Sequence, residues 1–289
     1  MRRPRVAITV GDPAGIGPEI AAKAAADPLV RSHCDPMVFG PPVGQAFAVG
    51  EVSAEAGQAA YDAIVRAVAA ARAGEVDAIA TAPVSKLAFA RAGLSWKGHT
   101  DLLAHLCGTP KVAMLFHSPE LVVVLATVHV PLAQVPGVLT RDGLIDTITL
   151  TAEWLPRFGI ARPRIAVAGL NPHAGENGIL GGEEEVIVRP AVQAAIDRGM
   201  TVSGPWPADT VFLRASRGEF DAVVACYHDQ GLIPIKLLAF GQAVNVTIGL
   251  PIIRTSVDHG TAFDIAGQGV ANPGSMIEAV LLAARLASA

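Results

Sequence analysis

The sequence predicts an α/β fold, in which strands form a largely parallel sheet that is covered on both faces by helices. Short β-branched runs alternate with alanine-rich stretches of helical length, which is the pattern of βαβ units. Several of these runs are apolar throughout, as is typical of strands buried on both faces. Apolar residues make up 51% of the 289 residues and charged residues only 17%, so the chain has ample material for a core and is not intrinsically disordered.

The predicted elements alternate from the N-terminus onward. The run at 5–10 predicts a strand, and the next helix is expected over 18–26, because proline is favoured in the first helical turn. A longer helix is expected over 54–73, where apolar residues recur at helical spacing and Gly74 provides a stop. Further strands are expected at 76–81, 121–127, 164–168, 222–226 and 243–248.

Composition also excludes several classes of protein. A net charge of −4 offers no general attraction to phosphate polymers, so nucleic acid is not an expected partner. The most apolar run, at 121–132, is too short for a membrane span and contains a histidine and a proline. No signal peptide is recognised at the N-terminus. Three widely spaced cysteines do not form a disulfide framework. We therefore expect a cytoplasmic protein without a membrane partner.

Five loops rich in glycine, proline and polar residues stand out, and most of them directly follow a predicted strand. In open α/β sheets, ligands bind beyond the carboxyl ends of the strands, so these loops are the expected location of an active site. They read GDPAGIGPE, GLNPHAGENG, GPWPADT, YHDQG and DHGTAFDIAGQG.

Three histidines, His129, His173 and His228, each lie at the end of a predicted strand and could meet at one sheet edge. Three neutral imidazoles with an open position are a recurring site for a catalytic divalent metal. Because no compact ligand motif is present, a purely structural role for each histidine stays open. Asp209 and Asp229 are candidate carboxylates that could orient a metal ligand or accept a substrate proton. The alternative for Asp209 is a helix N-cap or a turn.

An anion site is suggested by Lys236, Asn245 and Arg254, which flank a Gly-containing segment, FGQAVNVTIGLPIIRTS. Guanidinium and ammonium groups bind phosphate through charge and multiple donors, and an amide adds a neutral donor. Salt bridges at the surface are the alternative. The first loop has two glycines, Gly15 and Gly17, but no complete GxGxxG, so the usual dinucleotide-binding fingerprint is absent.

Taken together, these motifs resemble those of the 4-hydroxythreonine-4-phosphate dehydrogenase family of vitamin B6 biosynthesis. The resemblance rests on GDPAGIGPE, GHTD, ATVHVPL, GLNPHAGE, GPWPADT, YHDQGLIPIK and FGQAVNVTIGLPIIRTSVDHGTAFDIAG, in the same order over residues 5 to about 285. It implies a fold like that of isocitrate and isopropylmalate dehydrogenases, with two α/β domains and a central cleft. Residues 1–97 plus 240–289 would form the cofactor-binding domain. Residues 98–239 would form the domain for metal, substrate and dimerisation.

The resemblance also implies a role for individual residues. The metal ligands would be His129, His173 and His228, and the substrate would contact His99, Thr100, Lys236, Asn245 and Arg254. The DHGTAFDIAGQG segment is similar to the adenine-side loop of enzymes that bind NAD without GxGxxG, which assigns NAD or NADP to His259, Gly260, Asp264 and Asn272. The active site would lie at the subunit interface of a homodimer, with His228 supplied by the neighbouring subunit.

The activity that the resemblance implies is the metal-dependent, NAD(P)-linked oxidation of 4-phosphohydroxy-L-threonine, with decarboxylation to 3-amino-2-oxopropyl phosphate. Zinc is the expected metal, with magnesium, manganese and cobalt as alternatives. Asp209 or Asp229 would assist proton transfer. Alternative substrates are the related acids 4-phospho-D-threonate and 4-phospho-D-erythronate. A protein that binds metal and phosphate ester without redox activity is a further alternative.

One departure from the family pattern is expected to alter the cofactor domain. The chain runs from FGPP at 39–42 almost directly to GEVSAEAG at 50–57, where typical members carry several dozen further residues. Every motif with a predicted catalytic role is retained, so the shortening is expected to affect the edge of the cofactor domain and its choice between NAD and NADP.

Overall fold

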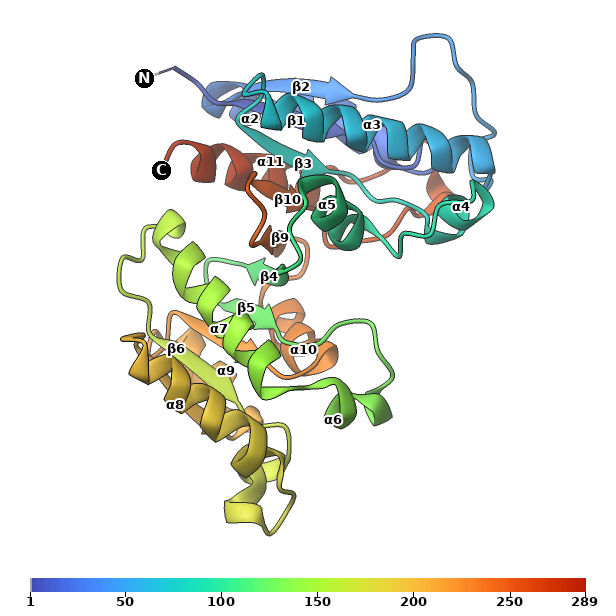
Figure 1. The fold of residues 1–289 in the computed structure, drawn as a ribbon. Coiled ribbons are helices and arrows are strands. Elements are labelled where there is room, and N and C mark those ends of the chain that lie inside the picture. Colours follow the sequence, from blue (N-terminus) through green and yellow to red (C-terminus); the bar gives the residue numbers. More distant parts are fainter. Residues whose placement is uncertain (1) are drawn as a thin grey trace. The chain divides into compact units, whose positions relative to one another are not determined.

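The computed structural model describes residues 2–289, which fold into two compact α/β units (Figure 1). The first unit extends to Pro110 and also includes Val244–Ala289, and the second is Lys111–Ala243. The sequence analysis placed the two crossings near residues 97 and 240. The first crossing lies later because helix α5 (His99–Cys107) packs on helix α3 (Ala54–Arg72) of the first unit.

The first unit is built on a sheet with the strand order β2-β1-β3-β10-β9. All neighbouring strands in it are parallel except β9 and β10, which are antiparallel. Its strands are β1 (Arg5–Thr9), β2 (Asp35–Phe39), β3 (Ala78–Thr81), β9 (Val244–Ile248) and β10 (Arg254–Ser256). Its other helices are α1 (Gly17–Ala26), α2 (Pro28–His33), α4 (Lys86–Arg91), α11 (Gly274–Ala287) and the 3₁₀ turn η5 (Phe263–Ile265).

Local sequence explains where the helices of this unit begin and end. The Ser53 side chain accepts a hydrogen bond from the Ala56 amide (3.0 Å) and so caps α3, and Gly74 follows the helix at φ +71°, a conformation that favours glycine. Asp27 caps α2 in the same way. The strands predicted at 5–10 and 76–81 and the helices predicted at 18–26 and 54–73 are confirmed to within two residues at each end.

The second unit contains the sheet β4-β5-β8-β6-β7, parallel except for the antiparallel pair β4 and β5. Its strands are β4 (Ala113–His117), β5 (Val122–Leu125), β6 (Ile165–Ala168), β7 (Val202–Trp206) and β8 (Ala222–Ala225). Its helices are α6 (Val135–Val138), α7 (Arg141–Trp154), α8 (Arg189–Asp197), α9 (Ala208–Ser216) and α10 (His228–Ala239). Short helical turns are η1 (Leu132–Gln134), η2 (Leu155–Phe158), η3 (Pro172–Gly178) and η4 (Glu184–Val188).

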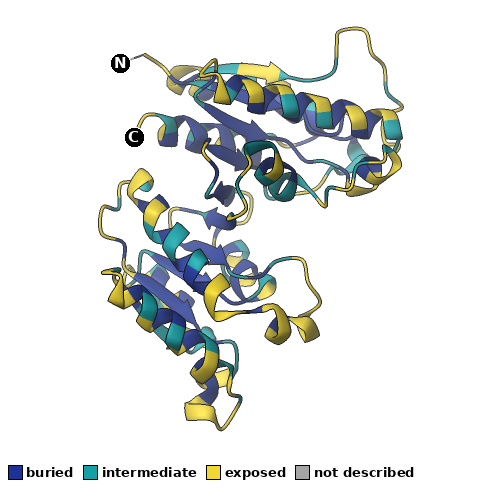
Figure 2. Cartoon of the chain, viewed as in Figure 1, coloured by how far each residue is buried: buried dark blue, intermediate teal, exposed yellow. Residues whose placement is uncertain are grey.

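The buried core of the second unit is formed by its strands together with residues of α7, α8, α9 and α10. Phe116, Leu125, Val223 and Ile235 belong to one buried apolar cluster. Figure 2 shows the central strands of both units as buried, whereas the edge strands β2 and β7 are mostly partly buried or exposed. Because β5, β8 and β6 are parallel neighbours, the segments that follow them leave the sheet at the same edge. In residues 2–289 no helix is both long and apolar enough to cross a membrane.

Candidate functional site

The side chain of Arg254, on β10, is the most unusual charged group of the first unit. It is only 2% exposed, and its guanidinium donates to Thr81 Oγ1 (3.2 Å from Nε and 2.7 Å from Nη2) and to Thr247 Oγ1 (2.8 Å from Nη1). Within residues 2–289 no carboxylate forms an ion pair with it. Burial lowers the pKa of Arg254 to about 9. A buried cation that contacts only neutral hydroxyls is a strong candidate for binding an anion.

Two further predicted substrate residues of the first unit carry buried polar atoms without a hydrogen-bond partner in the described chain. These atoms are Nε2 of His99, in the first turn of α5, and Oδ1 of Asn245, on β9. Such atoms are rare in folded proteins and are expected where a ligand supplies the missing partner. The structure therefore supplies His99, Asn245 and Arg254 in one unit as groups able to bind a polar ligand.

His99 and Thr100 are the first two residues of helix α5. Asp101 in the first turn accepts a hydrogen bond from the Lys97 amide, and Gly108 ends the helix at φ +65°. Leu102 and Leu103 form its buried face. The fifth predicted substrate residue, Lys236, belongs to the second unit, in the last turn of α10.

The pKa of His99 predicts how stability depends on pH. Burial, and to a smaller extent the charge of Arg254, lowers this pKa well below its usual 6.5. The unfolded chain therefore binds a proton at His99 at a higher pH than the folded chain does, so stability falls as the pH drops below about 6.5.

We expect His99→Gln to lose less unfolding free energy than the wild type between pH 7 and pH 5, measured by urea denaturation. His33→Gln, an exposed control, should behave like the wild type; equal slopes for all three would refute the assignment.

The three predicted metal ligands follow the neighbouring strands β5, β6 and β8 of the second unit. His129 lies in the loop after β5, and His228 is the first residue of α10, after β8. Their rings are 5.7 Å apart between centroids, and both line a pocket of about 310 Å³ with Tyr227 and Asp229. His129 has a φ of +53°, which is uncommon for a residue with a side chain. The structure thus brings two of the three histidines together within one chain.

The third histidine, His173, lies in η3 after β6 and also has a left-handed backbone (φ +52°). Within one chain, residues 2–289 contain no group of three histidine, cysteine or acidic residues placed to hold a metal ion. The loop of His173 is nevertheless fixed by buried Glu184, which accepts from the Asn171 amide (2.7 Å) and from Asn171 Nδ2 (2.9 Å). Glu184 was not predicted as a site residue; the only signal in the sequence is the acidic run GGEEEV, which follows this loop closely.

Of the two candidate carboxylates, Asp229 contacts His228, whereas the side chain of Asp209 forms no hydrogen bond or ion pair within residues 2–289. Asp229 Oδ1 lies 2.6 Å from His228 Nδ1, which orients the ring and leaves Nε2 available for a ligand. Asp209 is exposed in the first turn of α9, where its charge is also favourable for the helix. Both carboxylates line a second, largely apolar pocket of about 490 Å³ between α9 and α10.

The predicted cofactor residues lie on the segment 257–273 of the first unit, which connects β10 and α11 and is called the tail below. His259, Gly260, Asp264 and Asn272 are all exposed, and Asn272 also accepts a hydrogen bond from the Gly274 amide (2.8 Å) at the start of α11. The tail is attached to the first loop, because the Ile16 amide donates to the Thr261 carbonyl (3.0 Å).

Two residues of α1 also hold this tail, and the sequence analysis missed both. Lys23 donates to the carbonyls of Gly269 and Ala271 (both 2.9 Å), while Glu19 accepts from the Ala271 amide (2.9 Å). Only their spacing of four residues on one helix, which allows their mutual ion pair (2.7 Å), could have been seen beforehand.

Comparison with known proteins identifies close relatives along nearly the whole chain. Residues 19–283 match the sequence model of the family described as "Pyridoxal phosphate biosynthetic protein PdxA". The chain is 45% identical over 323 positions to a 4-hydroxythreonine-4-phosphate dehydrogenase of Desulforapulum autotrophicum, covering 98% of this chain and 95% of the relative. It is also 45% identical over 332 positions to a D-threonate 4-phosphate dehydrogenase of Cupriavidus necator, covering 99% and 98%.

Solved structures agree with these sequence matches. A 4-hydroxythreonine-4-phosphate dehydrogenase of Klebsiella pneumoniae has a TM-score of 0.90 at 42% identity and covers 99% of both chains. An isocitrate dehydrogenase of Methylococcus capsulatus, at 18% identity, a TM-score of 0.54 and coverage of 96% and 83%, shares the fold alone. The predicted α/β fold of the isocitrate dehydrogenase type is confirmed.

Proposed function

Because the chain belongs to the family of the pyridoxal phosphate biosynthetic protein PdxA, we propose that it is a metal-dependent, NAD(P)-linked dehydrogenase of a phosphorylated hydroxy acid. The observation that carries this proposal is Arg254, a buried cation whose hydrogen bonds go only to hydroxyl groups. A doubly charged phosphate is the kind of ligand that stabilises such a group.

The proposed substrate is 4-phosphohydroxy-L-threonine, with 3-amino-2-oxopropyl phosphate as the product. Its phosphate is assigned to Arg254, with neutral donors from His99, Thr100 and Asn245, and Lys236 is a further substrate contact. His99 suits this role because its lowered pKa keeps the ring neutral, so that a nitrogen can donate a hydrogen bond without adding a second buried charge.

The imidazole donors of the second unit fit a divalent metal ion. His129 and His228 lie side by side, and Asp229 holds His228 in the tautomer that leaves Nε2 free. Imidazole favours zinc or cobalt over magnesium, with manganese as a further alternative. A bound ion would lower the pKa of the substrate hydroxyl and would stabilise the negative charge on its oxygen after the proton is lost.

The third imidazole, His173, is proposed to come from a second copy of the chain. The resemblance assigned that role to His228, but the contact of His129 with His228 within one chain favours His173 instead. A homodimer is supported by an exposed apolar face formed by α10 and the residue that follows it, where Ile233, Leu237 and Phe240 are 65%, 84% and 84% exposed. A second copy that covers this face would complete the metal site.

Proton transfer is assigned to Asp209, since Asp229 is engaged with His228. The carboxylate accepts the proton of the secondary hydroxyl as the carbon-bound hydrogen leaves as hydride. His259, Gly260, Asp264 and Asn272 would hold NAD or NADP, which would supply the acceptor for this hydride. The resulting β-keto acid loses CO₂ through cleavage of a carbon–carbon bond, and protonation of the enolate yields the product.

The substrate is tested by NAD(P)H formation at 340 nm with purified protein and added zinc. We expect the highest kcat/KM with 4-phosphohydroxy-L-threonine and lower values with 4-phospho-D-threonate and 4-phospho-D-erythronate. The Cupriavidus necator relative makes 4-phospho-D-threonate the second candidate. Turnover only with the phospho-acids would support the proposed phosphate site but would show that the substrate is one of these acids. Binding of metal and phosphate ester with no NAD(P) reduction would favour a redox-inactive binding protein.

A further inference from the structure

The segment between β2 and α3 is the predicted place at which this chain is shorter than typical members of its family. The alignments extend over 323 and 332 positions, more than the 289 residues of the chain, so the relatives contain residues that this chain lacks. The sequence analysis placed the shortening at this segment. Residues 40–53 contain no helix or strand, and most of them are exposed.

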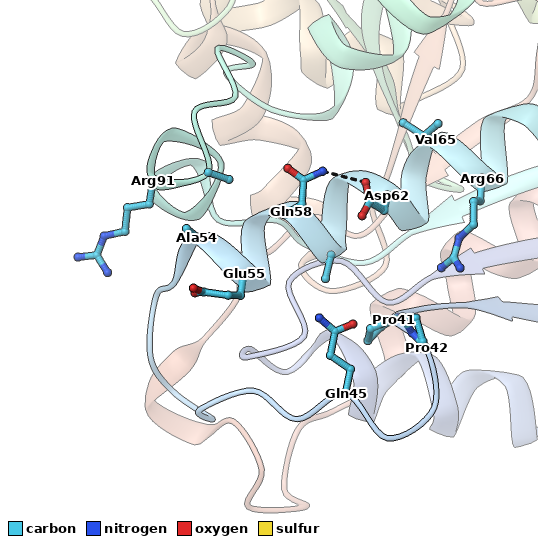
Figure 3. Close-up of a pocket in the computed structure, with 12 residues that line it drawn as sticks. Pro41, Pro42, Gln45, Ala54, Glu55, Gln58, Asp62, Val65, Arg66 and Arg91 are labelled. Carbon is cyan, nitrogen blue, oxygen red and sulfur yellow. Dashed lines mark hydrogen bonds between the residues drawn. The ribbon is translucent and has the colours of Figure 1, made fainter.

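Two arginines attach the ends of this segment to neighbouring helices. Arg66 of α3 donates to the Gly40 carbonyl, and Arg91 of α4 donates to the Val52 carbonyl. Figure 3 shows both arginines at the two ends of a pocket of about 810 Å³, which lies between α3 and the start of the segment. This pocket contains none of the candidate site residues, and its lining includes Gln45, Gln58 and Asp62.

The end of the segment contacts the tail that carries the proposed cofactor residues. A side-chain carbon added at Gly267 would lie 2.8 Å from Val49 Cγ1, so the Val49 side chain lies directly against this glycine. A carbon added at Gly50 would lie 3.1 Å from the Phe263 carbonyl oxygen. The Gly50 amide donates to the Ala14 carbonyl (2.8 Å). Val49 and Gly50 therefore touch both the tail and the first loop.

We propose that Val49 and Gly50 are positioning residues, which hold residues 261–269 of the tail in the conformation that binds the dinucleotide. The part concerning the dinucleotide rests on the proposed function. In this proposal the shortened segment itself holds the tail in place through Val49 and Gly50. These two residues are in turn held by the nearby hydrogen bond from Arg91 to the Val52 carbonyl.

A physical reason for this role is the exposure of the tail. Gly267, Gln268 and Gly269 are all exposed, and two of these three residues are glycines. Ordering exposed backbone on cofactor binding costs free energy, and a tail that is already held needs less ordering. Contacts with the tail should therefore act on cofactor affinity more than on affinity for the phosphorylated substrate.

The test compares Gly50→Ala with Gly44→Ala. Both glycines have a positive φ (+80° and +91°), so alanine strains the backbone at both positions. Only Gly50 faces the tail, because a carbon added at Gly44 has no neighbour within 4 Å. Val49→Ser is a further variant that weakens the contact with Gly267 without changing the backbone.

Two measurements are made on the full-length wild type and each variant. Amide hydrogen exchange of residues 261–269 is followed without cofactor, and NADH and NADPH binding is measured by fluorescence titration. For Gly50→Ala we expect about tenfold faster exchange in the tail and about threefold to tenfold weaker binding. Val49→Ser should shift both in the same direction by less. The KM for the phosphorylated substrate should stay within a factor of about two, as should every value for Gly44→Ala.

The proposal is overturned if Gly50→Ala matches Gly44→Ala in the exchange of residues 261–269, or if faster exchange leaves the affinity for a bound cofactor unchanged. A wild type that binds neither NADH nor NADPH contradicts the proposed function instead. In that case, the exchange measurement still decides whether Val49 and Gly50 hold the tail.

Discussion

A heterodimer of one His173→Ala chain and one His228→Ala chain is expected to be active, although each variant alone is inactive. If His173 serves the site of the partner, the subunit that carries His173→Ala keeps its own His129 and His228 and receives an intact His173. One of the two sites is then complete, so heterodimers purified with two different tags should show about half of the wild-type kcat. Both variants should remain folded, because His173 is exposed and His228 is only partly buried.

The matched control is a heterodimer of His129→Ala with His228→Ala. These two histidines lie together in one chain, so each subunit of this heterodimer lacks one of them, and we expect no activity. Activity in the control would assign His228 to the neighbouring subunit, as the resemblance implied. An inactive His173–His228 heterodimer that is folded and dimeric would reject a shared site altogether.

Substitution of Arg254 by methionine is expected to separate function from stability. Loss of a desolvated phosphate contact should cost about 2–5 kcal/mol of binding free energy. This loss should appear as a lower kcat/KM that comes mainly from a higher KM. The unfolding free energy should stay equal or rise, since an apolar side chain of similar volume replaces a buried cation without a carboxylate partner. A substitution that weakens activity without lowering the unfolding free energy is typical of a residue that is retained for binding.

Steady-state kinetics and urea denaturation of the same preparations test this expectation. Arg164→Met is the control, because Arg164 is half exposed and pairs with Asp221. It should leave KM unchanged. An unchanged KM in Arg254→Met would reject the anion site, and a large loss of stability would show that Arg254 serves the core instead.

Much of the fold could be predicted because burial leaves a local pattern. The strands β1, β3, β5, β6, β8 and β9 were found from apolar runs, and α3 from its spacing of apolar residues and its final glycine. Strand β4 pairs antiparallel with β5, and β10 is only three residues long. Strand β10 is too short to give a recognisable pattern, whereas the apolar run at 112–116, which forms most of β4, was not recognised as a strand.

The candidate site was predicted as a set of residues but not as a geometry. Motifs identified Arg254 and His129, yet the burial of Arg254 among hydroxyls and the contact of His129 with His228 arise only from packing. Glu184 and Glu19 hold functional segments from 13 and 252 positions away in the sequence. A carboxylate that acts at such a distance has no local signal.

The central claim is that the chain oxidises its substrate with the help of a metal held by histidines. It is tested most directly by following NADH or NADPH formation at 340 nm with 4-phosphohydroxy-L-threonine before chelation, after removal of bound metal, and after zinc is added back. The account predicts that turnover disappears with the metal and returns with zinc, while the protein stays folded throughout. Undiminished turnover in protein shown to be free of metal would contradict it.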